Sequence, residues 1–445
     1  MILKRVEISN YKNLKIKWDL TKSGNIVAIV GKNGSGKSNL LEALIALSNV
    51  ADDSEHIKTS FDGSLELSYD DGEKIIIGKE GLFQQIKINS KNRKTNKSNL
   101  FALEVPDFIK ISTYDEFAPR NFLSQRKYTK FNIKNISFKS FNELKYGDDF
   151  IPLLLFLFSH HKTNYAREIL LDVFGIEKIS PFTLCINNNI DYNKLKQPTK
   201  GYMDIIKEYL QCDNYSEVNN KQMSEEQLGC LVEKFGLEND FFEAIHTLMG
   251  PYYNDKAILS IDKLEIIKKG NNILVSDLSD GEKQLIYILA VMLYYTGKNI
   301  LLLLDEPDIH MYPNLQMSFI DYLRKINDKM NIIITTHSPY IVSSLDKNDV
   351  YCIYDGELYS VNFTKGKDYN SLLREIFNTP IRSLDIQNLI DEIYEILNND
   401  KLSTDNIKEI RKLMKILVNY LGEDDTTVIE IKTFLSLRKI NYEID

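Results

Sequence analysis

The segment Gly31–Ser38, with the sequence GKNGSGKS, constrains the fold of this chain more than any other feature. It follows the apolar, β-branched run 25–30 and precedes apolar residues at helical spacing over 39–47. A strand, a glycine-rich loop and a helix in this order form the setting in which backbone N–H groups surround phosphate oxygens. Within the loop, we expect Lys37 to reach the terminal phosphates and Ser38 to bind Mg²⁺. The sequence therefore predicts an α/β domain with a nucleotide phosphate site.

The predicted phosphate contacts extend through the loop into the first turn of its helix. Glycines permit backbone conformations that other residues avoid, so the chain can direct its N–H groups inward. The flanking strand and helix argue against the alternative, which is a glycine-rich turn without a ligand. The residues expected to contact the nucleotide here are Asn33, Gly34, Ser35, Gly36, Lys37, Ser38 and Asn39.

Two further apolar runs end in polar residues. Asp305 and Glu306 follow the run 301–304, and His337 comes shortly after the run 332–334. Apolar runs of this kind are typical of buried parallel strands, and ligands bind at the carboxyl ends of such strands. We expect Asp305 to hold the Mg²⁺ shell and Glu306 to orient and deprotonate a water. His337 is expected beside that water and the γ-phosphate, although an isolated histidine is more often a hydrogen-bonded structural residue.

His310 allows two interpretations. It lies between the two carboxylates and Pro313, at a place where the apolar strand has ended. The ring either lines the nucleotide site or caps the segment that begins near Pro313. The sequence alone does not decide between them.

The segment LSDGE at Leu278–Glu282 precedes a helical pattern over 282–295. Ser279 and Gly281 lie at the start of this helix, where backbone N–H groups favour anions. The alternative is an ordinary Ser-Asp-Gly helix cap. The order of the phosphate loop, this segment, the two carboxylates and the histidine resembles that of ABC-type ATPases. This resemblance implies a signature that contacts the γ-phosphate held by a second copy, and we favour that interpretation. ATP would then lie between two copies of this chain.

The bulk composition excludes several classes. The net charge of −8 argues against uniform nucleic-acid binding, and the four scattered cysteines are typical of reduced thiols in the cytoplasm. The N-terminus does not resemble a signal peptide and the apolar runs are too short to span a bilayer, so no membrane partner is expected. Local basic residues keep DNA as a candidate partner. These are Lys87, Lys91, Arg93, Lys94, Lys97, Arg126, Lys127, Lys130 and Lys134.

Changes in pattern divide the chain into four predicted segments. Residues 1–147 form the first part of an ATPase core, with the phosphate loop and a β subdomain. Residues 148–254 form a helical insertion, and 255–365 return to the core with the signature, the carboxylates and His337. Residues 366–445 carry amphipathic helical stripes only.

These motifs resemble those of the ABC-type ATPase heads of the SMC and OLD group, over about 1–50 and 259–345. The segments DEPDIHMYP at Asp305–Pro313 and TTHSP at Thr335–Pro339 are similar to those of stand-alone ATPases of bacterial anti-phage systems. The C-terminal helices, with LGEDDT at Leu421–Thr426, resemble most closely the PtuA family, the ATPases of the Septu system.

The resemblance implies an α/β fold: an ABC-type P-loop ATPase head with an antiparallel β subdomain, a helical insertion and a C-terminal helical extension. It implies ATP and Mg²⁺ as ligands and a second copy as partner, in a homodimer or a higher even-numbered oligomer. It assigns Walker A to Lys37 and Ser38, the signature to Ser279, Walker B to Asp305 and Glu306, and the switch histidine to His337.

One segment departs from the family pattern. The Q-loop glutamine of this family should follow the strand 108–112, but the sequence there reads TYDEF. Either Asp115 or Glu116 takes its place, or Gln84–Gln85 lies close to the site. Coupling of the metal through this loop is therefore an open expectation.

The sequence shows no nuclease constellation. About 80 helix-patterned residues follow the last predicted hairpin, which suits a helical hairpin better than a Toprim domain. His160–His161 are the only neighbouring histidines, too few for an HNH site. We therefore expect a sensor-scaffold ATPase of an anti-phage complex that regulates a separate, PtuB-like HNH nuclease by ATP-dependent head dimerisation. The alternatives are a DNA-repair or DNA-clamp ATPase acting directly on DNA, and the ATPase of a PARIS-type system with a Toprim effector.

Overall fold

The structure is a computed structural model of the chain, and it divides into two compact units, Met1–Tyr369 and Asn370–Asp445. The described residues are 2–48, 62–68, 74–80, 83–89, 107–112, 134–137, 154–155, 157–158, 164–187, 189–195, 197–235, 258–262, 264–294, 300–326, 330–379, 382–398 and 403–438.

A seven-stranded sheet lies at the centre of the first unit, in the order β18-β17-β3-β16-β15-β7-β8. Its strands are β3 (Ile26–Val30), β7 (Asp107–Ser112), β8 (Lys134–Ser137), β15 (Ile300–Asp305), β16 (Asn331–Thr335), β17 (Val350–Tyr354) and β18 (Glu357–Ser360). Neighbouring strands are parallel, except that β17 and β18 form an antiparallel hairpin. Every residue of β3 and β16 is buried, which explains their continuous apolar sequences.

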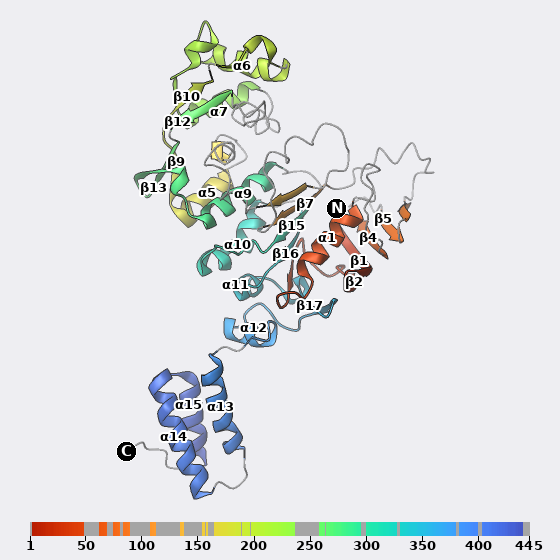
Figure 1. Cartoon of the computed structure of the whole chain (residues 1–445), viewed down its shortest axis with the longest axis vertical. Helices are drawn as coiled ribbons and strands as arrows, with labels where there is room; N and C mark the ends of the chain where they lie inside the picture. The colour runs from red at the N-terminus through yellow and green to blue at the C-terminus, as the bar shows by residue number, and fades with distance from the viewer. Residues whose placement is uncertain are drawn as a thin grey trace. The chain divides into compact units, whose positions relative to one another are not determined.

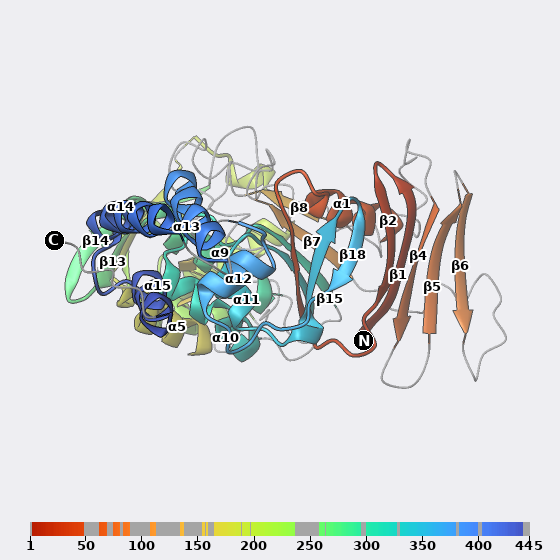
Figure 2. The same cartoon turned by 90° about the horizontal axis from the view of Figure 1, so that it is seen from below.

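Helices cover both faces of this sheet (Figures 1 and 2). Helix α1 (Lys37–Ser48) lies on one face, and α9 (Asp280–Tyr294), α10 (Pro313–Ile326) and α11 (Pro339–Ser343) lie on the other. Alternate strand residues point toward α1, because successive side chains of a strand face opposite ways. The cluster on the α1 side includes Val27, Ile29, Leu301, Leu303 and Ile333 with Leu40 and Leu44.

A five-stranded antiparallel sheet packs beside α1, in the order β2-β1-β4-β5-β6 (Figure 2). Its strands are β1 (Ile2–Tyr11), β2 (Leu14–Asp19), β4 (Asp62–Ser68), β5 (Lys74–Glu80) and β6 (Phe83–Asn89). Strand β2 alternates buried and exposed residues along its length, as expected for a half-buried strand. The antiparallel β subdomain predicted for the first segment is confirmed, whereas β6 and β8 were not predicted.

The predicted insertion contains helices α5 (Asn164–Phe174), α6 (Gln197–Tyr209) and α7 (Glu225–Phe235), with short 3₁₀ turns between them. It also contains strands that were not predicted: β9 (Ile176–Ile179), β10 (Phe182–Ile186) and β11 (Gln222–Met223). These strands pair with later ones, in the sheets β11-β10-β12 and β14-β13-β9. The later strands are β12 (Leu259–Asp262), β13 (Glu265–Lys268) and β14 (Asn271–Leu274). The segment is therefore joined to the core by non-local pairing.

The second unit contains helices with a core of their own. After α12 (Tyr369–Glu375), which spans the division between the units, come α13 (Leu384–Leu397), α14 (Thr404–Leu421) and α15 (Thr426–Leu437). Their shared core includes Ile390, Ile393, Leu397, Ile410, Leu413, Leu417, Val428, Ile431 and Leu435. We call α13, α14 and α15 the C-terminal bundle. The helical stripes predicted for α13 and α14 are confirmed, and α15 adds a third helix.

The predicted fold class is confirmed: a P-loop head with a parallel central sheet, an antiparallel β subdomain, a largely helical insertion and a helical C-terminal unit. The four segment boundaries stay predictions, and the compact division of the chain falls after Tyr369. None of the helices in the described ranges combines the length and the apolar character needed to cross a bilayer.

Candidate functional site

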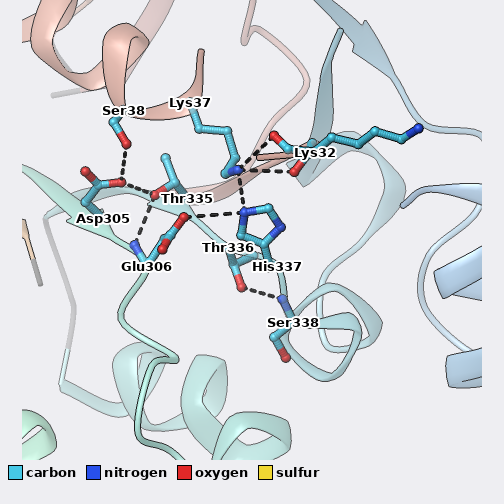
Figure 3. A network of polar contacts seen from close by, with 10 residues as sticks. Lys32, Lys37, Ser38, Asp305, Glu306, Thr335, Thr336, His337 and Ser338 are labelled. Carbon is cyan, nitrogen blue, oxygen red and sulfur yellow. Dashed lines mark hydrogen bonds and ion pairs between the residues drawn. The ribbon is translucent and has the colours of Figure 1, made fainter. Parts of the chain in front are cut away.

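Three of the four predicted motifs meet at one edge of the central sheet (Figure 3). Strand β3 runs into the glycine loop, β16 ends at Thr335 and β15 ends at Asp305. These strands are neighbours in the order β3-β16-β15, so parallel pairing brings their carboxyl ends together. The phosphate loop, the carboxylates and His337 therefore form a single cluster.

The glycine loop adopts a conformation that its glycines permit. Gly34 and Gly36 have φ angles of 76° and 105°, which residues with a side chain rarely adopt. At Gly31, a Cβ atom would lie 2.6 Å from the carbonyl oxygen of Ile353, so only glycine fits there. The hydroxyl of Ser35 is buried without a hydrogen-bond partner, and an anion in the loop would give it one. The loop therefore fits a phosphate group.

Lys37 places a nearly buried amine, with 5 % of its surface exposed, at the centre of the cluster. Its Nζ donates to the carbonyl oxygens of Gly31 at 3.1 Å and Lys32 at 3.4 Å, and lies 2.6 Å from Nε2 of His337. Burial lowers the pKa of Lys37, and the negative charges of Glu306 and Asp305 oppose that change. An anion bound here would replace these contacts and favour the charged amine.

One carboxylate oxygen of Asp305 accepts hydrogen bonds from the hydroxyl groups of both Ser38 and Thr335. Oδ1 of Asp305 lies 3.3 Å from the hydroxyl of Ser38 and 2.5 Å from the hydroxyl of Thr335. Thr335 is the direct partner of Asp305 in the pairing of β15 and β16. This oxygen donor set suits Mg²⁺, which prefers one or two carboxylates together with water and substrate phosphates. The described residues hold no group of three or more His, Cys, Asp and Glu side chains that could bind a metal by itself.

Glu306 turns out of the strand direction. Its φ is 50°, a left-handed value that costs a residue with a side chain about 1–3 kcal/mol. Its N–H donates to the carbonyl and the hydroxyl oxygen of Thr335, both at 3.0 Å. Its Oε1 lies 3.4 Å from Nε2 of His337. The strained turn thus directs the Glu306 carboxylate toward His337 and Lys37. Its role as the base that activates water stays a prediction.

The loop after Glu306 carries two further unusual residues. The carboxyl group of Asp308 has a buried oxygen without a hydrogen-bond partner, and burial raises its pKa although a hydrogen bond from Thr336 opposes this. His310 has a φ of 71° and an exposed side chain. Its carbonyl oxygen would lie 2.5 Å from a Cβ atom at Gly281. The backbone of His310 therefore packs closely on the signature turn, a role that neither interpretation of the sequence anticipated.

The signature turn itself forms a reciprocal helix cap. Helix α9 begins at Asp280, and the hydroxyl of Ser279 accepts from the Glu282 N–H at 3.4 Å. Oε2 of Glu282 accepts from the N–H and the hydroxyl of Ser279, both at 2.8 Å. This is a capping box. The local cap is therefore present, and contact of Ser279 and Gly281 with a phosphate of a second copy stays a prediction.

Sequence reasoning missed Thr335, which holds both Asp305 and the Glu306 backbone. The threonine was visible in the motif TTHSP, but its partner is known only from the strand register.

Several other predictions lie outside the residues whose side chains the structure describes. These are the Q-loop candidates Gln84, Gln85, Asp115 and Glu116, the pair His160–His161, and the nine basic residues proposed for DNA. The four cysteines all lie within the described ranges, and none of them forms a disulfide there.

Comparison with known proteins identifies a family and several relatives. A family model described as "AAA ATPase domain" matches residues 1–342. The chain is 25% identical over 99% of its length to "Septu protein PtuA" of Bacillus mycoides (strain KBAB4). It is 25% identical over 58% of its length to "Retron Ec83 probable ATPase" of Escherichia coli, and 22% identical over 92% to "Retron Vc95 probable ATPase" of Vibrio cholerae serotype O1 biovar El Tor. It spans 55%, 46% and 86% of these relatives, so about half the length of the first two.

Solved structures with partial likeness are SMC heads. The SMC head domain from Thermotoga maritima is 14% identical, with a TM-score of 0.35, and the match covers 81% of this chain and 100% of that one. An SmcHead bound to the C-winged helix domain of ScpA is 13% identical, with a TM-score of 0.37 over 82% of this chain and 98% of that one.

Proposed function

The chain belongs to the AAA ATPase domain family, and we propose that it is the ATP-driven sensor-scaffold subunit of an anti-phage defence complex. One observation carries the ATPase part: Lys37, Ser38, Asp305, Glu306 and His337 gather at one sheet edge through contacts of 2.6–3.4 Å. The defence part is supported by the relatives, which are a Septu protein and two retron ATPases.

Each residue of the cluster has a proposed task in hydrolysis. Lys37 exchanges the carbonyls of Gly31 and Lys32 for the terminal phosphates, whose negative charge matches its buried amine. Ser38 and Asp305 would hold Mg²⁺, which when bound neutralises phosphate charge. Glu306 accepts the proton of the attacking water. His337 contacts both Lys37 and Glu306, so it is placed to hold the Glu306 carboxylate in position.

The proposed partner in hydrolysis is a second copy. Ser279 and Gly281 would meet the γ-phosphate held by the other copy, since the N-terminus of α9 favours anions. ATP would then close two heads into a homodimer, or a higher even-numbered oligomer. Hydrolysis would separate the heads again, so that the assembly reports whether ATP is bound.

Two substitutions test this account. We expect Lys37→Ala to abolish ATP binding, because it removes the amine that faces the phosphates. We expect Glu306→Gln to keep ATP binding, to lower the hydrolysis rate about a thousandfold and to accumulate ATP-bound dimers. Binding, phosphate release and mass photometry measure the three properties, with Glu357→Gln on the exposed edge strand β18 as the control. Hydrolysis at the wild-type rate in Glu306→Gln would show that Glu306 is not the base.

The proposed effector is a separate HNH nuclease. Because head closure is the only output proposed for this chain, the nuclease should respond to the nucleotide state rather than to the protein alone. We expect the HNH protein encoded by a neighbouring gene to co-purify with the tagged chain and to show a different DNA cleavage rate with wild type than with Glu306→Gln at saturating ATP. Failure to bind, or equal cleavage in both states, would contradict the nuclease assignment while leaving the ATPase intact.

A further inference from the structure

The signature turn already holds an anion of its own. The N–H and the hydroxyl of Ser279 are the groups that a phosphate would take, and both donate to Oε2 of Glu282 at 2.8 Å. The other carboxylate oxygen, Oε1, accepts from Nζ of Lys268 at 2.5 Å. The Glu282 carboxylate is thus engaged on both sides, by the signature serine and by a lysine from another element.

Burial makes this arrangement strong. The side chain of Glu282 is 5 % exposed, and that of Lys268 is 27 % exposed. Charge-assisted hydrogen bonds are roughly twice as strong as neutral ones, and poor solvation strengthens them further. A phosphate that approaches Ser279 must therefore displace a charged, buried competitor.

Lys268 links this competitor to the insertion. It is the last residue of β13, which pairs with β9 from the segment 148–254 (Figure 1). In that pairing Lys268 lies opposite Ile176. A displacement of the β9–β13 pair would therefore change how closely the Lys268 amine approaches Glu282.

The signature turn and its helix also contact the loop that follows Glu306. The carbonyl oxygen of His310 packs against the Cα atom of Gly281, close enough to exclude a side chain there. The buried amide of Gln284 donates to the carbonyl oxygen of Pro307 at 2.7 Å. The backbone of this turn is therefore held beside the loop after Glu306. The two hydrogen-bond donors of Ser279 are engaged by Glu282, whose negative charge is balanced by Lys268.

We propose that Glu282 and Lys268 are positioning residues of the signature: Glu282 competes with the phosphate of the second copy for Ser279, and Lys268 weakens that competition by neutralising the carboxylate. This inference rests on the proposed function, because it requires Ser279 to meet a phosphate across a dimer. It makes the insertion a source of regulation, since Lys268 belongs to a sheet that the insertion completes.

The two ends of the ion pair should act with opposite signs. In Glu282→Gln the cap remains, but the acceptor is neutral and no longer repels the phosphate, so ATP-dependent dimers should form more readily. In Lys268→Met the carboxylate keeps both bonds to Ser279 without its counter-charge, so dimers should form less readily. In a merely structural role, both substitutions would weaken the dimer, because each breaks the same buried pair.

The experiment measures the ATP concentration that half-saturates dimer formation, by mass photometry, in full-length protein carrying Glu306→Gln. We expect a decrease of about tenfold for Glu282→Gln and an increase of about tenfold for Lys268→Met. In the presence of Glu282→Gln, Lys268→Met should have less than a twofold effect, because the lysine acts through the carboxylate. Lys283→Met, on the next residue of α9, is the control and should have less than a twofold effect.

The inference would be overturned by shifts of the same sign in both single variants. It would also be overturned if Lys268→Met had its full effect in the presence of Glu282→Gln. Thermal unfolding of each variant identifies any that fails to fold. ATP binding by single heads, measured below the dimer concentration, confirms that the phosphate loop is intact. If Glu306→Gln alone forms no ATP-dependent dimer, the proposed function fails instead, so the two failures are distinguishable.

Discussion

The nucleotide centre and the C-terminal bundle use polar groups in opposite ways. In the centre, the buried amine of Lys37 lies close to the buried carboxylate of Asp305 and the partly buried carboxylate of Glu306, and the backbone is strained at Glu306. In the bundle, the interior is apolar and the polar groups serve as caps, such as Ser403 and Asp425. In the centre, backbone strain and buried polar groups lower the folding stability and are suited to binding a ligand. In the bundle, helix caps and an apolar core raise the folding stability.

This difference separates two kinds of variant. Substitutions in the centre should change ATP chemistry with little effect on unfolding, because the groups they remove contribute little to stability. Substitutions in the bundle should change unfolding with little effect on ATP chemistry.

Leu417→Ala should lower the unfolding free energy of the bundle by about 3 kcal/mol, because it leaves a cavity at a fully buried position of α14. Ile416→Ala, at the adjacent exposed position of the same helix, should cost less than about 1 kcal/mol. Native-state hydrogen exchange in the full chain measures both values. ATPase activity should stay within twofold of wild type in both, and a larger loss in Leu417→Ala would break the separation.

Arg382→Ala should lower the unfolding free energy of the bundle by about 2 kcal/mol. The guanidinium bonds both carboxylate oxygens of Asp425, at 2.8 and 3.0 Å, and the hydroxyl of Thr427. Asp425 also caps the N-terminus of α15, so the loss of its Arg382 partner should weaken the start of that helix. The matched control is Lys408→Ala, which removes an exposed pair with Asp405 and should have no measurable effect.

The same pair predicts a pH dependence. Burial raises the pKa of Asp425, but hydrogen bonds from Arg382 and from the Thr427 N–H outweigh burial and leave the pKa below its ordinary value of 3.8. A carboxyl group with a lowered pKa stabilises the fold above that ordinary value and ceases to do so as the pH falls through the folded value. The stability difference between wild type and Arg382→Ala should therefore be constant at neutral pH and shrink below 3.8. A stability difference between wild type and Arg382→Ala that grew on acidification would contradict a lowered pKa of Asp425.

Thr335→Val should lower the hydrolysis rate about tenfold, equivalent to about 1.4 kcal/mol. It removes the hydroxyl that holds Oδ1 of Asp305 and receives the Glu306 N–H. Thr364→Val is the matched control, because Thr364 is equally buried but bonds the carbonyl oxygen of Leu345 away from the centre. Steady-state kinetics with thermal unfolding measure the pair. Equal hydrolysis rates in the two valine variants would show that the Thr335 hydroxyl has no role in the nucleotide site.

The parts of the fold that the sequence predicted are those with local signals. The glycine loop lies between an apolar strand and a helix, so Lys37 and Ser38 could be placed without knowledge of any distant partner. The helices α13 and α14 were visible from the spacing of their apolar residues. Both regions follow rules that depend on neighbours in the chain.

The missed parts depend on pairing between distant segments. Strand β9 has only four residues, and it pairs with β13, which follows the end of the predicted insertion in the sequence. The role of Thr335 follows from its register with Asp305, and nothing near Thr335 in sequence reveals it. The left-handed backbone of Glu306 likewise has no local signal, because glutamate does not favour it.

The central claim is that each site needs a signature from a second copy, and mixing two inactive variants tests it most directly. Lys37→Ala lacks a working phosphate loop, and Ser279→Arg lacks a working signature, so each should be inactive alone. A mixed dimer contains one complete site, formed by the loop of one copy and the signature of the other. An equal mixture should therefore recover roughly a quarter of the wild-type ATPase rate, since half of the dimers are mixed and each has one of two sites. A mixture no more active than its components would contradict the shared site.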